Sequence, residues 1–457
     1  MKFFVAVMTV LTIFFQTGLT WAQEEKLNDD RLLKIEEELI KIREDQEQGK
    51  KALEEIKKEP KMIPPSAPQE MEKLPIKIGA SITLRYDRTE TEDQADLLLG
   101  DNEIEGLRTR VRLSFEYNQQ GRLAAGMRLS TGENPNPTSP FIRLGDASRS
   151  KSFNLDQFYI VYRPLKSFEE ISFTIGKMPL PFWRGDRGSW RTEMIWDDDI
   201  NPEGVALRTP ILSGSSKISI ENTAGYFTIN EVTDNVFSGL TGDTYLFADQ
   251  INVRVDQGTG GGTLAVAIYD YHKLNAGLQS PNFTPGSGGF VTPGASALLV
   301  REGLQHTNNQ VNYGPGAEGF LDERFTSLNL TAQLYHPISL NPMGLEVFWV
   351  GDYVKNMSVD QDERGYGVTG GLRGGGKGRI APFNLWYTYR EVDADATLAT
   401  FADSDLGAGT AYKGFEFVAN YRILSDLLVQ FSYFDFDGFP RKDNNVTRMF
   451  VDLVKTF

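Results

Sequence analysis

Apolar and polar residues alternate with a period of two along most of residues 76–457. In the clearest segment, 104–118, Arg108, Arg110 and Arg112 alternate with apolar residues. Side chains of a β-strand point alternately to its two faces, so the pattern predicts strands with one apolar and one polar face. A half-buried sandwich and a membrane barrel both contain such strands. Segments of about ten residues with Tyr or Phe near their ends favour the barrel.

The alternation predicts about sixteen strands, an even number of the kind that closes an antiparallel barrel. The connections between them are alternately short and long, which places tight turns at one end and long loops at the other. This is the construction of outer-membrane barrels. The predicted strands cover residues 76–88, 104–118, 121–131, 153–163, 169–178, 203–211, 216–229, 244–255, 263–272, 325–337, 344–354, 365–375, 379–391, 411–422, 427–436 and 446–457.

The first 22 residues are typical of a secretory signal peptide. Lys2 gives the charged start, residues 3–15 are mainly apolar, and Thr20-Trp21-Ala22 is a small-x-Ala cleavage site. A single transmembrane helix is the alternative, but the apolar run is too short for one. Beyond residue 22 no stretch approaches the ~18 apolar residues of a membrane helix. We therefore expect an exported protein that enters a membrane, if at all, as strands.

Residues 23–59 have a different pattern, with apolar residues at alternating spacings of three and four. This spacing predicts an α-helical coiled coil. A solitary solvated helix is the alternative, but a stripe this narrow is marginal in water. Prolines at positions 60, 64, 65 and 68 predict an extended linker over residues 60–75 to the barrel domain, 76–457. The helical seam consists of Leu32, Ile35, Leu39, Ile42, Leu53 and Ile56, and it is interrupted by Gln46 and Gly49.

Composition excludes several classes of function. The chain has no cysteine, which removes disulfides, thiolate metal sites and cysteine nucleophiles. Its three histidines, His272, His306 and His336, are far apart in sequence and lie beside no convincing nucleophile. The net charge of −15 argues against nucleic acid as a partner. We expect no enzyme activity and no cofactor.

Several short stretches together resemble the bacterial putative porin family, which is similar in style to the general porins. They are LSTG at 129–132, NPTS at 136–139, LDQFY at 155–159, GKMP at 176–179, WDDDINPEG at 196–204, YRE at 389–391 and DSD at 403–405. The resemblance covers most of residues 76–457 and implies a trimeric diffusion channel of sixteen strands. It also implies that the third long loop folds into the lumen and narrows it. It covers the coiled coil and the 273–324 loop less well.

The WDDDINPEG stretch belongs to this third long loop, and the first three strands carry a series of arginines on one face. Arginine on a lipid-facing surface costs ~2–4 kcal/mol near the midplane, so these side chains are expected to face water. We predict an acidic lip opposite a basic pore wall, which would create a transverse electric field. The predicted lip is Glu193, Asp197, Asp198, Asp199 and Glu203, and the predicted wall is Arg85, Arg108, Arg110, Arg112, Arg122 and Arg128.

Other interpretations of these charges stay open. The charged groups could pair and simply hold the loop in place, or the arginines could mark an anion- or phosphate-selective channel. The barrel could also be only the anchor of an envelope tether or adhesin. A calcium site within residues 197–203 is disfavoured because the spacing does not match a calcium-binding loop, and we predict no metal. The expected partners are outer-membrane lipids, two further copies of the chain, and peptidoglycan or a periplasmic partner through residues 24–59.

Overall fold

A computed structural model gives the structure of the protein. It describes residues 76–91, 103–118, 121–132, 140–145, 147–148, 150–164, 171–186, 190–212, 217–230, 243–258, 260–272, 274, 324–338, 344–375, 382–406, 409–438 and 444–457. The predicted signal peptide, coiled coil and linker lie outside these residues, as do residues 273 and 275–323 of the predicted 273–324 loop, and they stay predictions. Within the described ranges no helix is long and apolar enough to cross a membrane.

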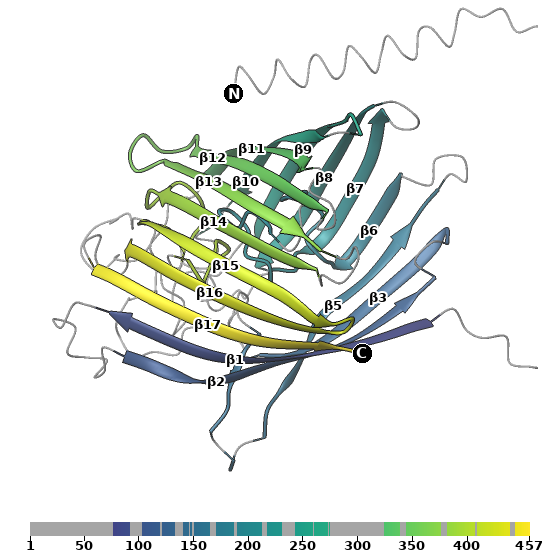
Figure 1. Cartoon of the computed structure of the whole chain (residues 1–457). Helices are drawn as coiled ribbons and strands as arrows, with labels where there is room; N and C mark the ends of the chain where they lie inside the picture. Colours follow the sequence, from purple (N-terminus) through teal and green to yellow (C-terminus); the bar gives the residue numbers. More distant parts are fainter. Residues whose placement is uncertain are drawn as a thin grey trace, which may run out of the picture. The chain divides into compact units, whose positions relative to one another are not determined.

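Sixteen antiparallel strands form one closed ring, and a two-residue strand, β4, pairs with the part of β2 that β3 does not reach (Figure 1). Apart from β4, each strand pairs with the strands before and after it, so that β3 pairs with β5; β1 pairs with β17, where Leu84 lies opposite Leu453. The strands are β1 (Ile76–Thr91), β2 (Glu103–Tyr117), β3 (Leu123–Thr131), β4 (Ile142–Arg143), β5 (Phe153–Tyr162), β6 (Ser172–Lys177), β7 (Glu203–Leu212), β8 (Ile218–Asn230), β9 (Thr244–Asp256), β10 (Gly261–His272), β11 (Arg324–Ile338), β12 (Leu345–Asn356), β13 (Arg364–Gly374), β14 (Phe383–Val392), β15 (Tyr412–Leu424), β16 (Leu427–Gly438) and β17 (Asn444–Thr456).

The predicted all-β barrel of sixteen strands is confirmed. The period-two pattern located each strand of the ring within a few residues, because the two faces of every strand meet different surroundings. No pattern in the sequence predicted β4, whose Ile142 pairs with Thr109 of β2. Strand β3 pairs with β2 only from Arg112 to Tyr117, so β4 continues the ring where β3 has ended.

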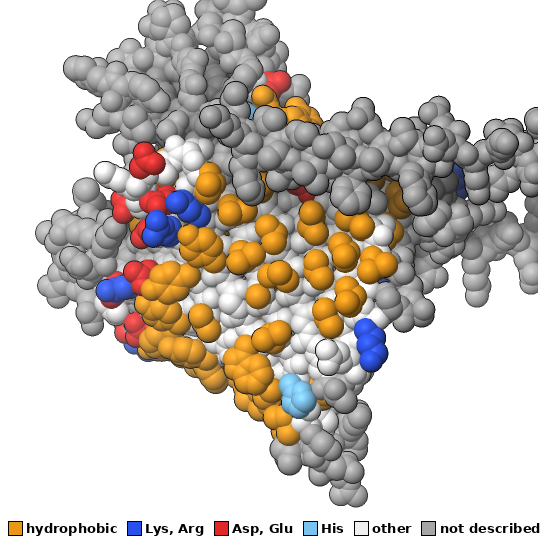
Figure 2. Space-filling view, turned by 90° about the horizontal axis from the view of Figure 1, so that it is seen from above, with side chains coloured by type: hydrophobic (Ala, Val, Ile, Leu, Met, Phe, Trp, Pro, Cys, Tyr) orange, Lys and Arg blue, Asp and Glu red, His pale blue; other side chains and the backbone are white. Residues whose placement is uncertain are grey.

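The outer face of the ring is apolar. On β10 the exposed apolar residues are Leu264 and Val266, two positions apart. On β12 they are Trp349 and Tyr353, four positions apart and therefore on the same face. Figure 2 shows hydrophobic side chains over most of one outer surface, with acidic and basic side chains gathered along one edge. A continuous apolar band bordered by charge is the surface that a lipid bilayer requires.

The inner face carries the alternate residues, and many of them are buried and polar. Gln250 on β9 and Gln333 on β11 are almost fully buried, as is Thr331. Buried polar groups need hydrogen-bond partners. Asp352 of β12 accepts from Thr331, whereas a loop folded into the barrel supplies the partners of Gln250 and Gln333. Apolar residues of this loop and of a second inward-folded loop join the main hydrophobic cluster with Phe227, Tyr269 and other inward side chains.

Candidate pore constriction

The loop between β6 and β7, residues 178–202, crosses the inside of the barrel; we call it the constriction loop. Its Trp183 N–H donates to Gln250 Oε1 of β9 at 2.7 Å, and Gln250 Nε2 donates back to Trp183 O at 2.9 Å. Gln333 Nε2 of β11 donates to Asp186 at 2.6 Å. Thr192 bonds the buried Asp352 of β12. Contacts spread over this many strands mean that the loop spans the lumen.

Glycines direct and accommodate this path. Gly176, just before the loop, has a φ of 120°, and a Cβ there would lie 2.3 Å from the carbonyl oxygen of Phe158. Only glycine adopts this backbone without strain. On β13 a Cβ at Gly365 would lie 3.1 Å from the sulfur of Met194, a buried residue of the constriction loop. The small residues of β13 therefore leave the space that the loop fills.

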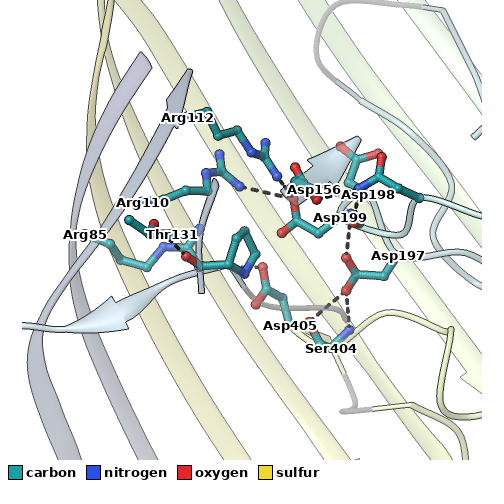
Figure 3. A network of polar contacts seen from close by, with 12 residues as sticks. Arg85, Arg110, Arg112, Thr131, Asp156, Asp197, Asp198, Asp199, Ser404 and Asp405 are labelled. Carbon is teal, nitrogen blue, oxygen red and sulfur yellow. Dashed lines mark hydrogen bonds and ion pairs between the residues drawn. The ribbon is translucent and has the colours of Figure 1, made fainter. Parts of the chain in front are cut away.

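The three consecutive aspartates have three different partners. Asp197 is buried, and its Oδ1 accepts the N–H of Asp199 at 2.9 Å, a local turn typical of aspartate. Asp198 has a half-exposed side chain that accepts from Arg184 of the same loop at 2.5 Å. Asp199 reaches the wall, where Arg112 Nη2 lies at 2.5 Å and Arg110 Nη1 at 3.4 Å from its Oδ1. Only Asp199 joins the acidic lip directly to the arginine wall (Figure 3).

The other wall arginines pair with carboxylates of neighbouring strands. Arg85 binds Asp452 of β17 through two parallel bonds of 2.8 and 2.9 Å, a geometry that fixes the guanidinium plane. Arg108 lies 2.7 Å from Asp87, and Arg128 donates to Asp156 at 2.5 Å. These partners were missed from the sequence, although the period of two places Asp87 and Asp452 on the same inner face as Arg85.

Two predicted site residues lie elsewhere. Glu203 is the first residue of β7 and shares the face of the exposed Val205, opposite the buried Ala206; it pairs across strands with Lys177 at 2.6 Å. Its carboxylate therefore belongs to the outer rim and not to the lip. Arg122 precedes β3 at a short turn, and its guanidinium lies over the ring of Tyr162, 5.6 Å from the centroid. The alternation of inward and outward side chains does not hold before the strand begins, so Arg122 is not part of the inner wall.

A second loop, residues 393–411 between β14 and β15, also lies inside the barrel; we call it the second lumen loop. Its Ala396, Leu398 and Leu406 are almost fully buried. Asn356 Nδ2 donates to Asp395 O at 2.9 Å, and Arg448 Nη1 donates to Ser404 O at 2.8 Å. The sequence predicted a long loop here but not its inward fold. Its many small apolar residues between aspartates were the available signal.

The two loops bring together three carboxylates, those of Glu193, Asp197 and Asp403, with one oxygen of each within 4.8 Å of the others. Burial, together with neighbouring carboxylates, raises the pKa of Glu193 and of Asp197 well above the ordinary range. Burial also raises the pKa of Asp403 to about 6, against the opposing effect of Arg390, which donates to it at 2.5 Å. The cluster therefore retains protons at pH values where an exposed carboxyl has lost them.

Asp199 behaves in the opposite way. Burial raises its pKa, but the nearby guanidinium groups of Arg110 and Arg112 outweigh burial and hold the pKa below the ordinary value. The lip is therefore charged where it meets the wall, and it carries protons where the two loops meet. This division is the main electrostatic property of the constriction.

Residues 79–457 match the model of a protein family described as "Putative porin". The chain belongs to this family. Comparison with curated protein sequences finds no match.

Solved structures of outer-membrane proteins are similar in fold. The high-pH structure of Pseudomonas putida OprB has a TM-score of 0.50 and 11% identity, and covers 84% of this chain and 94% of that one. Salmonella typhi OmpF in complex with daunomycin has a TM-score of 0.45 and 12% identity, and the match covers 84% of this chain and 97% of that one. A loop-deletion mutant of Vibrio cholerae OmpT has a TM-score of 0.43 and 10% identity, and the match covers 84% of this chain and 100% of that one. At these identities the OprB likeness concerns the fold alone.

Proposed function

We propose that this family member is an outer-membrane porin, a channel for passive diffusion of ions and small hydrophilic solutes. The observation that carries the proposal is the constriction loop of a closed barrel, whose Asp199 meets Arg110 and Arg112 of the opposite wall. A barrel that served only as an anchor would need no charged lip aimed across its lumen. The family membership and the apolar outer face support the same function.

The acidic lip and basic wall would act on solutes through their field. Charges of opposite sign on two sides of a narrow passage orient dipolar solutes and disfavour apolar ones. Asp198, with its half-exposed side chain, adds negative charge to the lip, while Arg110 and Arg112 are about a fifth exposed. The pairing of these groups also holds the loop in place, so the selective and structural roles coexist.

An anion- or phosphate-selective channel is the weaker alternative. Arg85, Arg108 and Arg128 each have a carboxylate partner on the wall itself, which offsets their positive charge. A wall built to bind anions would leave such guanidinium groups without partners. We therefore propose a channel without strong preference for phosphate and without enzymatic chemistry.

The remaining parts of the proposal concern location and assembly. We propose an outer-membrane location after removal of residues 1–22, and a homotrimer surrounded by lipid. Residues 24–59 would reinforce the trimer or reach peptidoglycan or another periplasmic partner. These proposals rest on the sequence patterns and on the family membership.

Single-channel recording in planar bilayers tests the function. The purified, folded protein is expected to give stepwise, ohmic conductance in KCl, and a salt gradient then gives the ratio of cation to anion permeability. A folded protein that inserts and conducts nothing would refute the porin proposal and favour the tether or adhesin.

A further inference from the structure

The second lumen loop is anchored to strands at several separate points. Arg448 of β17 donates to the carbonyl oxygens of Ser404 and Asp405, at 2.8 and 2.9 Å. Arg390 of β14, which is almost fully buried, donates to Asp403. These anchors rest on charged donors, which make stronger bonds than neutral ones. The segment around Ser404 is therefore held firmly to the wall.

This segment packs directly against the constriction loop. Asp197 N–H donates to Phe401 O at 2.7 Å, and Asp403 N–H donates to Glu193 O at 3.0 Å. The rings of Trp196 and Phe401 stack with centroids 5.5 Å apart and an interplanar angle of 27°. Backbone bonds in both directions together with an aromatic stack make the two loops one packed unit.

A continuous series of hydrogen bonds runs through this contact to the arginine wall (Figure 3). Ser404 donates both its N–H, at 3.1 Å, and its hydroxyl, at 2.8 Å, to Oδ2 of Asp197. The other oxygen of Asp197 accepts the N–H of Asp199 at 2.9 Å. The carboxylate of Asp199 then accepts from Arg110 and Arg112. Two donors on one oxygen fix the plane of the Asp197 carboxyl, and that plane fixes the backbone of Asp199.

We propose that the second lumen loop is a second constriction loop, in which Ser404 is a positioning residue that acts through Asp197 to aim Asp199 at Arg110 and Arg112. The same loop also contributes Asp405, whose carboxylate lies 3.8 Å from Arg85 and whose side chain is 44% exposed. Ion selectivity then depends on a residue that does not touch the wall arginines. The inference rests on the proposed channel function.

The test compares Ser404→Ala with Ser404→Thr and with Ser327→Ala in the full-length protein. Ser404→Ala removes the hydroxyl bond to Asp197, and Ser404→Thr keeps a hydroxyl. Ser327 is a matched control, because its buried hydroxyl bonds Ala396 O of the same loop but lies outside the series. Each variant is also made in an Asp199→Asn background. Reversal potential in a KCl gradient is measured, and heat-modifiable gel mobility reports whether the barrel is folded.

Ser404→Ala is expected to move the ratio of cation to anion permeability towards anions by roughly fourfold (about twofold for each ion), against about sixteenfold for Asp199→Asn (about fourfold for each ion). The shift is smaller because in Ser404→Ala the Asp199 carboxylate is retained but spends part of the time away from the arginines. Ser404→Thr and Ser327→Ala should keep the wild-type ratio. In the Asp199→Asn background Ser404→Ala should add nothing. Two outcomes would overturn the inference and leave the proposed channel intact. In the first, Asp199→Asn shifts the permeability ratio but Ser404→Ala keeps the wild-type value. In the second, Ser404→Ala and Ser327→Ala shift the ratio equally. A folded wild type that does not conduct would instead refute the channel.

Discussion

Neutralising Asp199 is the most direct perturbation of the constriction. In Asp199→Asn the side chain keeps its shape but loses its charge, and Arg110 and Arg112 lose the carboxylate that lies 3.4 and 2.5 Å from them. Two guanidinium groups would then face the passage without a counter-charge. The charge of the passage becomes more positive by one unit where the loop meets the arginine wall, so we expect the channel to move towards anion selectivity.

The size of the effect follows from Coulomb's law. A monovalent ion passing about 5 Å from the removed charge gains or loses ~0.8 kcal/mol in a water-like dielectric, and several-fold more in a drier passage. This energy corresponds to a change of about fourfold in the permeability of that ion. Salt screens the interaction over a Debye length of ~10 Å at 0.1 M, so the shift should shrink as the salt concentration rises.

The assay is the reversal potential of single channels under a KCl gradient, measured at low and high salt. Asp198→Asn is the matched control, because it removes the same charge from the next residue, whose partner is Arg184 and not the wall. The control should give a smaller shift. An unchanged potential for Asp199→Asn would refute the role of the lip in selectivity. Equal shifts for both variants would mean that net charge matters and the contact with the arginine pair does not.

Three further predictions concern the path of the loop, its titration and the N-terminal segment. Gly176→Ala should lower the free energy of unfolding, measured by urea denaturation, by ~1–3 kcal/mol, because the φ of Gly176 is 120° and a Cβ there would meet Phe158 O. Gly106→Ala is the control: nothing lies within 4 Å of a Cβ at that position, so the free energy of unfolding should change little. The folded state holds extra protons on Glu193, Asp197 and Asp403, so the contact between the loops should be most stable in acid and weaken as pH rises from the ordinary carboxyl range through about 6 and beyond. Glu193→Gln should flatten this profile of denaturation midpoint against pH, and a wild-type midpoint that does not fall with rising pH would contradict the assignment. Deleting residues 24–59 should weaken the proposed trimer or its proposed attachment to the cell wall, measured by cross-linking and peptidoglycan pull-down. Unchanged behaviour in both would count against the coiled coil.

The barrel could be predicted from the alternation of residues alone. Each strand has one face towards lipid and one towards the interior, so its residues alternate between apolar and polar. The number and order of the strands could therefore be predicted without knowing any contact. The same parity placed Arg108, Arg110 and Arg112 on the inside. Two residues were misplaced for different reasons: Arg122 lies before β3, where the alternation no longer applies, whereas Glu203 is already the first residue of β7, and the alternation within that strand puts it on the outward face.

The paths and contacts of the loops became visible only in the folded protein. Loops have no repeating pattern that reports their surroundings, so the inward fold of residues 393–411 and its contact with residues 178–202 depend on partners far away in sequence. The three aspartates show this most clearly. Nothing in three identical side chains distinguishes Asp197, bound to Ser404, from Asp198, paired with Arg184, or from Asp199, aimed at the wall. Their different roles arise because the turn at Asp197 points each carboxylate towards a different neighbour.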